Sequence, residues 1–332
     1  MTKLSDIAKQ TGLSVSAICD ILHGRGGYND ETRRKVINVA RKLNYKANPN
    51  ARQLLGLNSH VFGVLVGTGD EVVNFDRLLA LENEAFKKGY RLLIGQIHKD
   101  ESRTTEYMQD FAARGVDGII WLRQPFNKRL IAKKEYFKKM TNILFLDEAL
   151  ISGSISVTVD YSRGIEQAYS HLKNKGRERI GLAIASKGIP GDPMDARQKG
   201  FLKSSDNDKA MMWIGDGNPI PTSDAINNAI ECLVIKNNAD AIIASNDFWA
   251  VEFIRQFRRR KIRVPDDVAV IGYDNLVISR TSDPELTTID QQHEIFAEKA
   301  IDALSQSVMS MGDLPVERNI NIKPKLIERA TT

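Results

Sequence analysis

The first 45 residues contain three runs in which apolar positions recur at the spacing of an α-helix. The first run predicts a short helix at about 5–10, and Gly12 provides the turn after it. Ser14 is placed to cap a second helix over VSAICDIL, and Asn29 or Asp30 to cap a third over DETRRKVINVARKLNY. The predicted apolar faces consist of Leu4, Ile7, Ala8, Ala17, Ile18, Ile21, Leu22, Val36, Ile37, Ala40 and Leu43. Two short helices joined by a glycine-containing turn, with a third to complete a core, are typical of a helix-turn-helix module.

From residue 60 onward, short apolar runs alternate with amphipathic stretches. The runs that predict buried strands lie at 61–66, 91–97, 117–122, 142–147, 156–160, 179–185, 210–214, 240–245 and 268–274. Continuous apolar strands separated by helices indicate parallel sheets with helices on both faces. These runs are too many for one sheet of usual size. We therefore expect an α/β core of two doubly wound parallel-sheet subdomains, with a ligand cleft between them at the carboxyl ends of the strands.

Charge is unevenly distributed along the 332 residues, whose formal net charge is +5. Residues 1–59 hold ten basic and four acidic side chains, so the rest of the chain carries a net charge of −1. A small basic module in front of a large, nearly neutral body indicates a polyanion-binding segment attached to a domain with another task. On charge alone, a basic surface that is merely solvated remains the alternative.

Composition and motifs exclude several classes of protein. The only cysteines, Cys19 and Cys232, are far apart, which excludes a disulfide framework and fits a reducing cytoplasm. No apolar run approaches the ~20 residues of a membrane helix, and MTKLSDIAKQTG lacks the apolar segment of a secretory signal. We expect a cytoplasmic protein.

The search for catalytic motifs finds no complete one. The GxG sequences at 67–69 and 215–217 are incomplete, because Val72 and Ile220 stand where GxGxxG requires its third glycine. The five histidines lack metal-ligand spacing, and no GxSxG elbow is present. We expect no enzyme activity, no cofactor and no metal.

The segment from Lys3 to Gly56 resembles the DNA-binding headpiece of the lactose-repressor (LacI/GalR) family of transcription regulators. The resemblance is carried by LSDIAKQTGLS, by TRRKV and LNY in the third helix, and by NPNARQLLG after it. It implies a helix-turn-helix domain at 1–46 and a hinge helix with linker at 47–59. In this family the second helix enters the major groove, and the hinge helix pairs with its twin in the minor groove.

The resemblance also implies a role for individual side chains. Base edges would be read by Val15, Ser16 and Asp20, and Tyr45 would lie near the backbone. Phosphates would be held by Ser14, His23, Thr32, Asn48 and the cap near Asn29. Leu54 matches a leucine that wedges between base pairs, although an ordinary packing leucine is the alternative. The full implied set is Ser14, Val15, Ser16, Ala17, Asp20, His23, Asn29, Thr32, Tyr45, Asn48, Ala51 and Leu54.

The second predicted helix departs from the family pattern. Ala17, Cys19 and Asp20 stand where the family usually has threonine, serine and, frequently, arginine. An arginine can bind guanine O6 and N7 with two hydrogen bonds, whereas an aspartate repels phosphate and can accept from cytosine N4. We therefore expect an operator that differs from the usual family palindrome at the corresponding base pair.

The body of the chain resembles the same family, whose core is similar to a periplasmic sugar-binding protein. The landmarks are RGVDGII, VDYSRG, KGRERIGLA, ASNDFWA, RVPDDVAVIGYDN and PELTTI. The resemblance implies an effector-binding and dimerisation core at 60–332, with chain crossings near 160, 290 and 318. Subdomain one would comprise 60–160 plus 291–317, and subdomain two 161–290 plus 318–332. Glu252 and Lys261 replace family glycines, and we expect both on helix surfaces.

Five core residues match family positions that bind the effector: Asp147, Arg197, Asn246, Asp274 and His293. Their carboxylate, amide and guanidinium groups suit vicinal hydroxyls or purine edges. Four of them also have a structural alternative. Asp274 would be a turn or cap residue, Arg197 part of an ion pair, Asn246 a helix cap and His293 a packed or exposed side chain.

The family resemblance implies a repressor that binds a near-palindromic double-stranded DNA operator as a homodimer. A small-molecule effector in the core cleft, a sugar by first expectation and a nucleoside or purine by second, would control its affinity for DNA. A solute-binding receptor without DNA function is the alternative that the core alone permits. An enzyme acting in the cleft is the third.

Overall fold

The computed structural model describes residues 3–22, 26–43, 58–67, 71–97, 101–122, 142–147, 153–187, 193–205, 210–218, 220–310 and 317–332. Residue contacts divide the chain into two compact units, Met1–Ser59 and His60–Thr332. Within the described ranges, no helix is long and apolar enough to cross a membrane. In those same ranges, no group of three or more His, Cys, Asp or Glu side chains could hold a metal ion.

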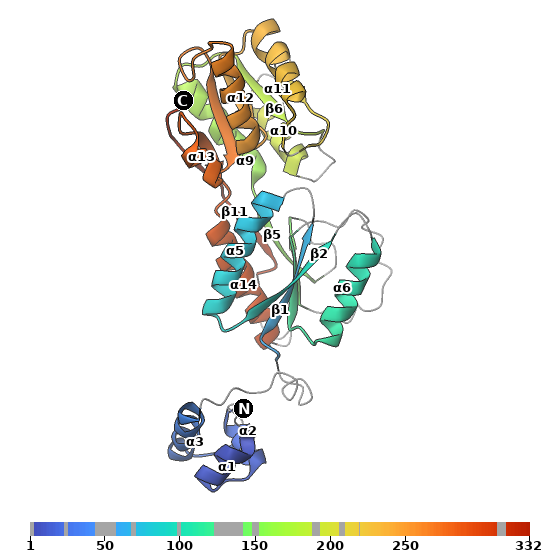
Figure 1. The fold of residues 1–332 in the computed structure, drawn as a ribbon, viewed down its shortest axis with the longest axis vertical. Coiled ribbons are helices and arrows are strands. Elements are labelled where there is room, and N and C mark those ends of the chain that lie inside the picture. The colour runs from blue at the N-terminus through green and yellow to red at the C-terminus, as the bar shows by residue number, and fades with distance from the viewer. Residues whose placement is uncertain are drawn as a thin grey trace. The chain divides into compact units, whose positions relative to one another are not determined.

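The first unit contains three helices, α1 (Leu4–Thr11), α2 (Val15–Leu22) and α3 (Asp30–Lys42) (Figure 1). Gly12 ends α1 in the left-handed conformation, with φ 75°, and so turns the chain toward α2. The buried core consists of Ile7, Ile18, Ile21, Val36 and Ala40. The predicted helices are confirmed, but Ile37, expected on the buried face of the third, is exposed.

Two six-stranded sheets form the second unit, which confirms the predicted α/β core. The first sheet has the order β11–β5–β4–β3–β1–β2, and all its neighbours are parallel. Its strands are β1 (Val61–Gly67), β2 (Arg91–Ile97), β3 (Gly118–Trp121), β4 (Ile143–Leu146), β5 (Ile155–Val159) and β11 (Asn319–Ile322). We call this sheet and its helices the first subdomain.

The second sheet has the order β12–β10–β9–β8–β6–β7 and is parallel except for β12, which runs antiparallel to β10. Its strands are β6 (Ile180–Ile184), β7 (Met211–Ile214), β8 (Ala241–Ala244), β9 (Ala269–Asp274), β10 (Thr287–Asp290) and β12 (Lys325–Ile327). Its helices are α9 (Tyr161–Asn174), α10 (Pro193–Ser204), α11 (Ser223–Ile230), the π-helix η2 (Glu231–Lys236), α12 (Asp247–Arg259) and α13 (Val277–Thr281). Sheet and helices form the second subdomain.

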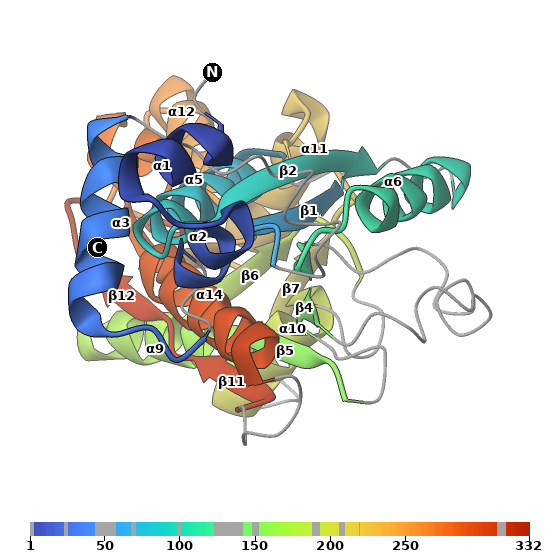
Figure 2. The ribbon, with the colours of Figure 1, turned by 90° about the horizontal axis from the view of Figure 1, so that it is seen from below.

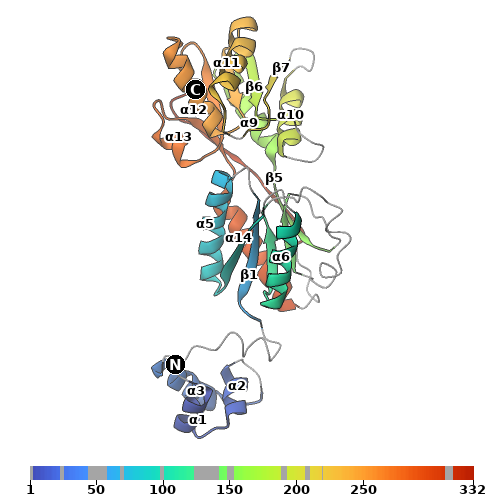
Figure 3. The same cartoon turned by 45° about the vertical axis from the view of Figure 1, so that its right-hand side comes forward.

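Helices cover both faces of the first sheet. Helices α5 (Glu71–Lys87) and α14 (His293–Ser310) lie on one face and α6 (Glu101–Ala113) lies on the other (Figures 1, 2 and 3). Alternate strand residues face the two layers. Ile120 packs in the cluster that contains residues of α5 and α14, while Ile119 packs in the cluster that contains residues of α6. A strand that is buried on both faces has a continuous run of apolar residues, and such runs allowed these strands to be predicted from the sequence.

The chain crosses between the subdomains three times. The first two crossings follow Val159 and Asp290, near the predicted positions. The third, predicted near 318, is wrong by several residues. Residues 319–322 pair with β5 in the first sheet, so the crossing follows Ile322. Strand β11 alternates exposed and buried residues because it is an edge strand, and it therefore lacks the continuous apolar run of the buried strands.

The two positions where family glycines are replaced differ in the structure. Glu252 lies on α12, where its carboxylate binds Arg255 at 2.8 Å, as expected for a helix surface. Lys261 does not lie on a helix. It follows the end of α12 with φ 59°, in the left-handed region that favours glycine. The expectation for Lys261 is therefore wrong, because the helix ends at Arg259.

Candidate DNA-binding surface and effector site

The start of α2 presents the predicted DNA-reading side chains. Ser14 caps the helix, because its Oγ accepts a hydrogen bond from the Ala17 backbone N–H at 3.2 Å. Val15 and Ser16 are exposed in the first turn, and Asp20 is half-buried one turn later. Ala17 is only 9% exposed and so leaves little surface for a DNA contact. Val15, Ser16 and Asp20 therefore share the accessible part of α2.

A second predicted contact region lies at the start of α3. Asn29 Oδ1 accepts from the Thr32 backbone N–H at 2.8 Å, so Asn29 is the cap that the sequence left open between two residues. Arg33 donates to the carbonyl oxygens of Tyr28, at 3.1 Å, and Gly26, at 2.6 Å. These bonds hold the segment before α3 against the helix. The predicted DNA-contacting residues His23, Tyr45, Asn48, Ala51 and Leu54 lie outside the described residues.

In the second unit, five buried side chains from both subdomains form what we call the polar cluster: Arg77, Tyr161, Arg197, Asp274 and Gln291. Arg77 comes from α5 of the first subdomain. Tyr161 begins α9 after the first crossing, and Gln291 lies in the second crossing. Arg197 comes from α10, and Asp274 ends β9 in the second subdomain. The cluster thus joins the two subdomains where the chain passes between them.

Hydrogen bonds connect the members of the polar cluster in a chain. Arg77 donates to Gln291 Oε1, and Gln291 Nε2 donates to Asp274 Oδ1. Arg77 also donates to the Tyr161 hydroxyl at 3.4 Å. On the other side, Arg197 Nη2 lies 3.6 Å from Asp274 Oδ1, and Arg197 Nη1 donates to the Ser245 carbonyl at 2.8 Å. Arg197 and Asp274, both predicted effector-binding residues, are therefore direct neighbours.

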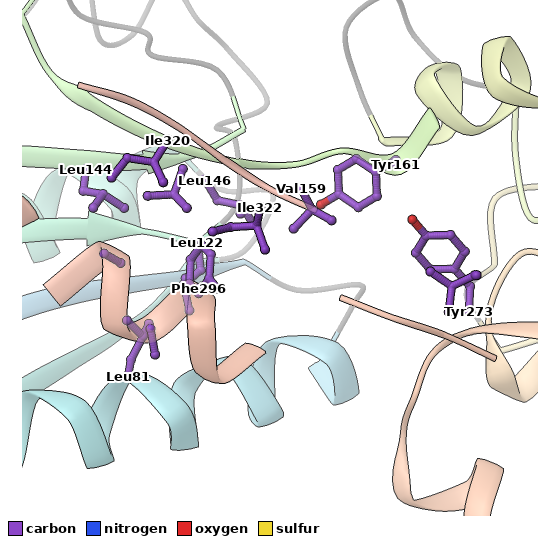
Figure 4. Packing of buried hydrophobic residues seen from close by; sticks show 14 of the residues in the cluster. Leu81, Leu122, Leu144, Leu146, Val159, Tyr161, Tyr273, Phe296, Ile320 and Ile322 are labelled. Atoms are coloured by element: carbon purple, nitrogen blue, oxygen red, sulfur yellow. The ribbon is translucent and has the colours of Figure 1, made fainter. Parts of the chain in front are cut away.

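Two tyrosine rings enclose the Arg197 guanidinium. Its central carbon lies 4.0 Å from the ring centroid of Tyr273 and 5.3 Å from that of Tyr161. The two rings are neighbours, with centroids 6.4 Å apart, as Figure 4 shows. Burial raises the pKa of both tyrosine hydroxyl groups, so both stay protonated at neutral pH. A cation over aromatic rings and next to a carboxylate is held in one orientation.

Asp147 and Asp274 occupy equivalent positions in the two subdomains. Each directly follows or ends a parallel strand, and each has a positive φ, 71° and 107° respectively. Such a backbone conformation is uncommon for a residue other than glycine and clusters at functional sites. The Asp147 charge raises the pKa of Arg77 and Tyr161, which places this carboxylate near the polar cluster.

His293, the fifth predicted effector-binding residue, begins α14. Among the described residues neither of its buried ring nitrogens has a hydrogen-bond partner. Burial, together with the positive charge of Arg77, lowers the His293 pKa to about 3. The imidazole is therefore neutral at physiological pH and offers one donor and one acceptor.

Asn246 caps α12, because its Oδ1 accepts from the Trp249 backbone N–H at 3.0 Å. A helix cap is the structural alternative to effector binding that the sequence analysis gave for Asn246. The next residue, Asp247, is fully buried and accepts hydrogen bonds from the Leu276 backbone N–H, at 2.7 Å, and from the Thr288 hydroxyl. Burial raises the pKa of Asp247 well above its usual value. Its bonds tie α12 to the segment that follows Asp274 and so position that carboxylate.

Sequence reasoning missed Arg77, Tyr161, Tyr273 and Gln291. The signal for Arg77 was available, since it lies four residues before the buried Leu81 on one helical face, where a charged residue is unexpected. Gln291 gave no comparable signal. Its partners lie 214 and 17 residues away in the chain, so only the fold brings them together.

The comparisons with known proteins cover the whole chain. Residues 169–332 match the family described as periplasmic binding protein-like domain. DegA of Bacillus subtilis, an HTH-type transcriptional regulator, is 28% identical over 338 residues, which cover 100% of this chain and 98% of DegA. The HTH-type transcriptional repressor PurR of Mannheimia succiniciproducens is 25% identical over 336 residues, covering 99% of this chain and 98% of that protein.

Solved structures show the same fold. The lac repressor dimer bound to operator and the anti-inducer ONPF superimposes with a TM-score of 0.76 at 22% identity, and the match covers 100% of this chain and 99% of that one. The CcpA regulator from Weissella paramesenteroides with bound glucose gives 0.68 at 19% identity, over 82% of this chain and 98% of that one. The helical headpiece and the two-sheet unit therefore occur together in proteins of known structure.

Proposed function

We propose that this chain, a homologue over its full length of the HTH-type transcription regulators of the lactose-repressor family, is a sequence-specific repressor. Like these relatives, which are regulators and not enzymes, it would act on DNA. The finer proposal has three parts. The chain binds a near-palindromic operator as a homodimer. It binds a small-molecule effector, a sugar or sugar derivative, at the polar cluster. Effector binding changes the affinity for DNA.

The headpiece supports DNA binding through shape and charge. A short α2 with exposed Val15 and Ser16 at its start is suited to enter the major groove, as in other helix-turn-helix proteins. The surplus of basic side chains in residues 1–59 would neutralise phosphates. In this proposal residues 1–46 read the major groove and residues 47–59 supply the hinge, with Leu54 as the minor-groove wedge.

An apolar surface supports the homodimer. Phe75, Leu79 and Phe86 are exposed along α5, and Ile94 is exposed on the edge strand β2. Val277 on α13 is also exposed. Helix α13 lies near α5, since the charge of Arg280 on α13 lowers the pKa of Asp76 on α5, which burial raises. Exposed apolar groups gathered in this way mark an interface. A second copy of the chain would cover residues of both subdomains.

The position of the polar cluster supports coupling between effector and DNA. Its members come from both subdomains and from two of the three crossings, so a ligand that contacts them favours one relative arrangement of the subdomains. The proposed dimer surface includes α5, which also supplies Arg77. A change at the cluster would therefore reach the dimer surface and, through it, the spacing of the two headpieces.

The observation that carries the proposal is a helix-turn-helix unit joined to a two-sheet unit whose buried polar side chains bridge both subdomains. The test is selection of bound sequences from random DNA by the full-length protein, followed by titration of the selected site with and without candidate metabolites. We expect a near-palindromic site whose affinity falls as salt rises, with a log–log slope of about −0.9 per neutralised phosphate. Absence of any sequence preference, with retained metabolite binding, would instead favour a solute-binding receptor.

A further inference from the structure

Arg77 is a buried cation that forms no direct ion pair with a described carboxylate, although the charges of Asp147 and Asp274 raise its pKa. Arg77 is only 5% exposed. No carboxylate among the described residues forms an ion pair with its guanidinium group. Its hydrogen-bond partners, Gln291 and Tyr161, are both neutral. Its Nε is buried and has no partner. A guanidinium removed from water normally acquires a paired anion, because burial of an uncompensated charge is strongly unfavourable.

The carboxylates of Asp147 and Asp274 act on Arg77 through their charge, but neither is hydrogen-bonded to it. Asp274 interacts with Arg197, at 3.6 Å, and with Gln291, which separates it from Arg77. The face of Arg77 toward Phe296 is occupied by the ring, whose centroid is 5.8 Å from the guanidinium carbon. The direct contacts that orient Arg77 are therefore neutral and aromatic groups, and its Nε remains able to donate to a ligand.

Two further groups near Arg77 lack partners among the described residues. Neither ring nitrogen of His293 has one, and neither does Arg197 Nε, although all three atoms are buried. Together with Arg77 Nε, these atoms present mainly N–H donors. A ligand that satisfies several N–H donors, two of them on guanidinium groups, carries acceptor oxygens, and charged donors bind anionic oxygens most strongly.

We infer that the effector of this chain carries an anionic group, a carboxylate or a phosphate, and that Arg77 binds this group with His293 beside it. The inference rests on the proposed function, since it specifies the chemical class of the effector for the same site. Sugar acids and sugar phosphates are compounds of this class. Arg77 would then be the residue that separates them from the neutral parent sugar.

The first test uses simple anions as probes of the full-length protein. Thermal unfolding is followed in sodium phosphate, sodium acetate and sodium chloride at equal ionic strength. The variants are Arg77→Gln and, as a matched control, Arg259→Gln, which removes an exposed arginine at the end of α12. We expect phosphate or acetate to raise the melting temperature of the wild type and of Arg259→Gln more than that of Arg77→Gln. The inference is overturned if all three respond equally or if none responds.

The second test separates the two anion sources. Glucose, glucuronate and glucose 6-phosphate, and likewise ribose and ribose 5-phosphate, are titrated against wild type and Arg77→Gln by calorimetry. We expect the anionic member of a set to bind more tightly than the neutral one, and Arg77→Gln to weaken its binding by about ten- to hundredfold. Preference for glucuronate identifies the anionic group as a carboxylate, and preference for a sugar phosphate identifies it as a phosphate. Equal binding of neutral and anionic members to both proteins overturns the inference.

Operator binding in the same samples distinguishes this inference from the proposed function. A neutral sugar that changes operator affinity equally in wild type and Arg77→Gln would overturn the anionic effector and leave the regulated repressor standing. An anion that binds through Arg77 without any change in operator affinity would support the anionic site and contradict its regulatory role.

Discussion

Gln291 donates a hydrogen bond to the carboxylate of Asp274, and this bond joins the second crossing between the subdomains to the end of strand β9. The same side chain accepts from Arg77 of the first subdomain. One amide therefore satisfies a buried cation on one side and a buried carboxylate on the other. Because neither partner is accessible to water, the bridge has consequences for both stability and regulation.

Replacement of Gln291 is expected to destabilise the second unit. Gln291→Ala removes one buried hydrogen bond from Arg77 and one from Asp274, which costs about 1–3 kcal/mol. Urea unfolding of the full-length protein measures the loss. Gln292→Ala is the control, because the hydrogen bond of Gln292 to Asp290 uses its backbone N–H. Equal stability of the two variants would contradict the bridging role.

Replacement of Asp20 is expected to change which operator is bound. Asp20→Arg restores a side chain that can bind guanine with two hydrogen bonds, a contact with a discrimination of about 1–3 kcal/mol. Selection from random DNA should recover guanine at one position of each half-site for the variant and a different base for the wild type. Glu231→Arg, which makes the same charge change on the exposed side of η2, should retain the wild-type site. An unchanged site in Asp20→Arg would remove Asp20 from the base-reading set.

A charge on the apolar surface of α5 is expected to prevent dimer formation. Leu79 and Ile235 are similarly exposed, at 48% and 51%, but only Leu79 lies on the proposed interface. Leu79→Lys should sediment as a monomer and should bind the operator at least about 100-fold more weakly, because two linked headpieces bind far more tightly than one. Ile235→Lys should sediment and bind like the wild type. A dimeric Leu79→Lys would place the interface elsewhere.

A glycine at position 261 is expected to stabilise the protein. Lys261 has φ 59°, which disfavours a residue with a Cβ by about 1 kcal/mol. Lys261→Gly relieves this strain and should raise the free energy of unfolding by about 0.5–1 kcal/mol. The greater conformational entropy of glycine in the unfolded chain offsets part of this gain. Lys261→Ala keeps the Cβ and should show no gain. A Lys261→Gly protein that is less stable than Lys261→Ala would contradict this account.

Protonation of His293 is expected to reduce stability in mild acid. Burial lowers its pKa from 6.5, the ordinary value of histidine, to about 3 in the folded protein. The unfolded chain therefore binds the proton first, so stability is fully present above pH 6.5 and falls as the pH approaches 3. Between pH 6.5 and 5 the loss is on the order of 2 kcal/mol.

Denaturant unfolding at several pH values tests the role of His293. His293→Phe should make the free energy of unfolding less dependent on pH in this interval. His171, whose pKa burial also lowers, provides the control, because its Nε2 lies 2.9 Å from the Thr332 hydroxyl outside the polar cluster. If His293→Phe retains the full pH dependence while His171→Gln loses it, His293 is not the titrating group.

The sequence by itself determined the local structure. The three headpiece helices follow from apolar spacing, from the cap at Ser14 and from Gly12, all of which act within a few residues. The nine strands predicted from apolar runs are present. Seven of them are almost fully buried and need such runs, whereas β2 and β7 are partly exposed edge strands. Arg197 and Asp274 were predicted through the family resemblance, and the structure places them side by side.

Only the tertiary structure decided which distant groups meet. Arg77 and Gln291 are separated by 214 residues, and nothing local in either segment encodes their hydrogen bond. Strand β11 and the third crossing depend on pairing with β5. In this pairing Asn319 lies opposite Ser156, which is 163 residues earlier in the chain. Local pattern fixes what a segment becomes because helix and strand periodicity are short-range properties. A binding site is assembled by long-range packing, which brings together side chains whose chemistry is visible in the sequence but whose neighbours are not.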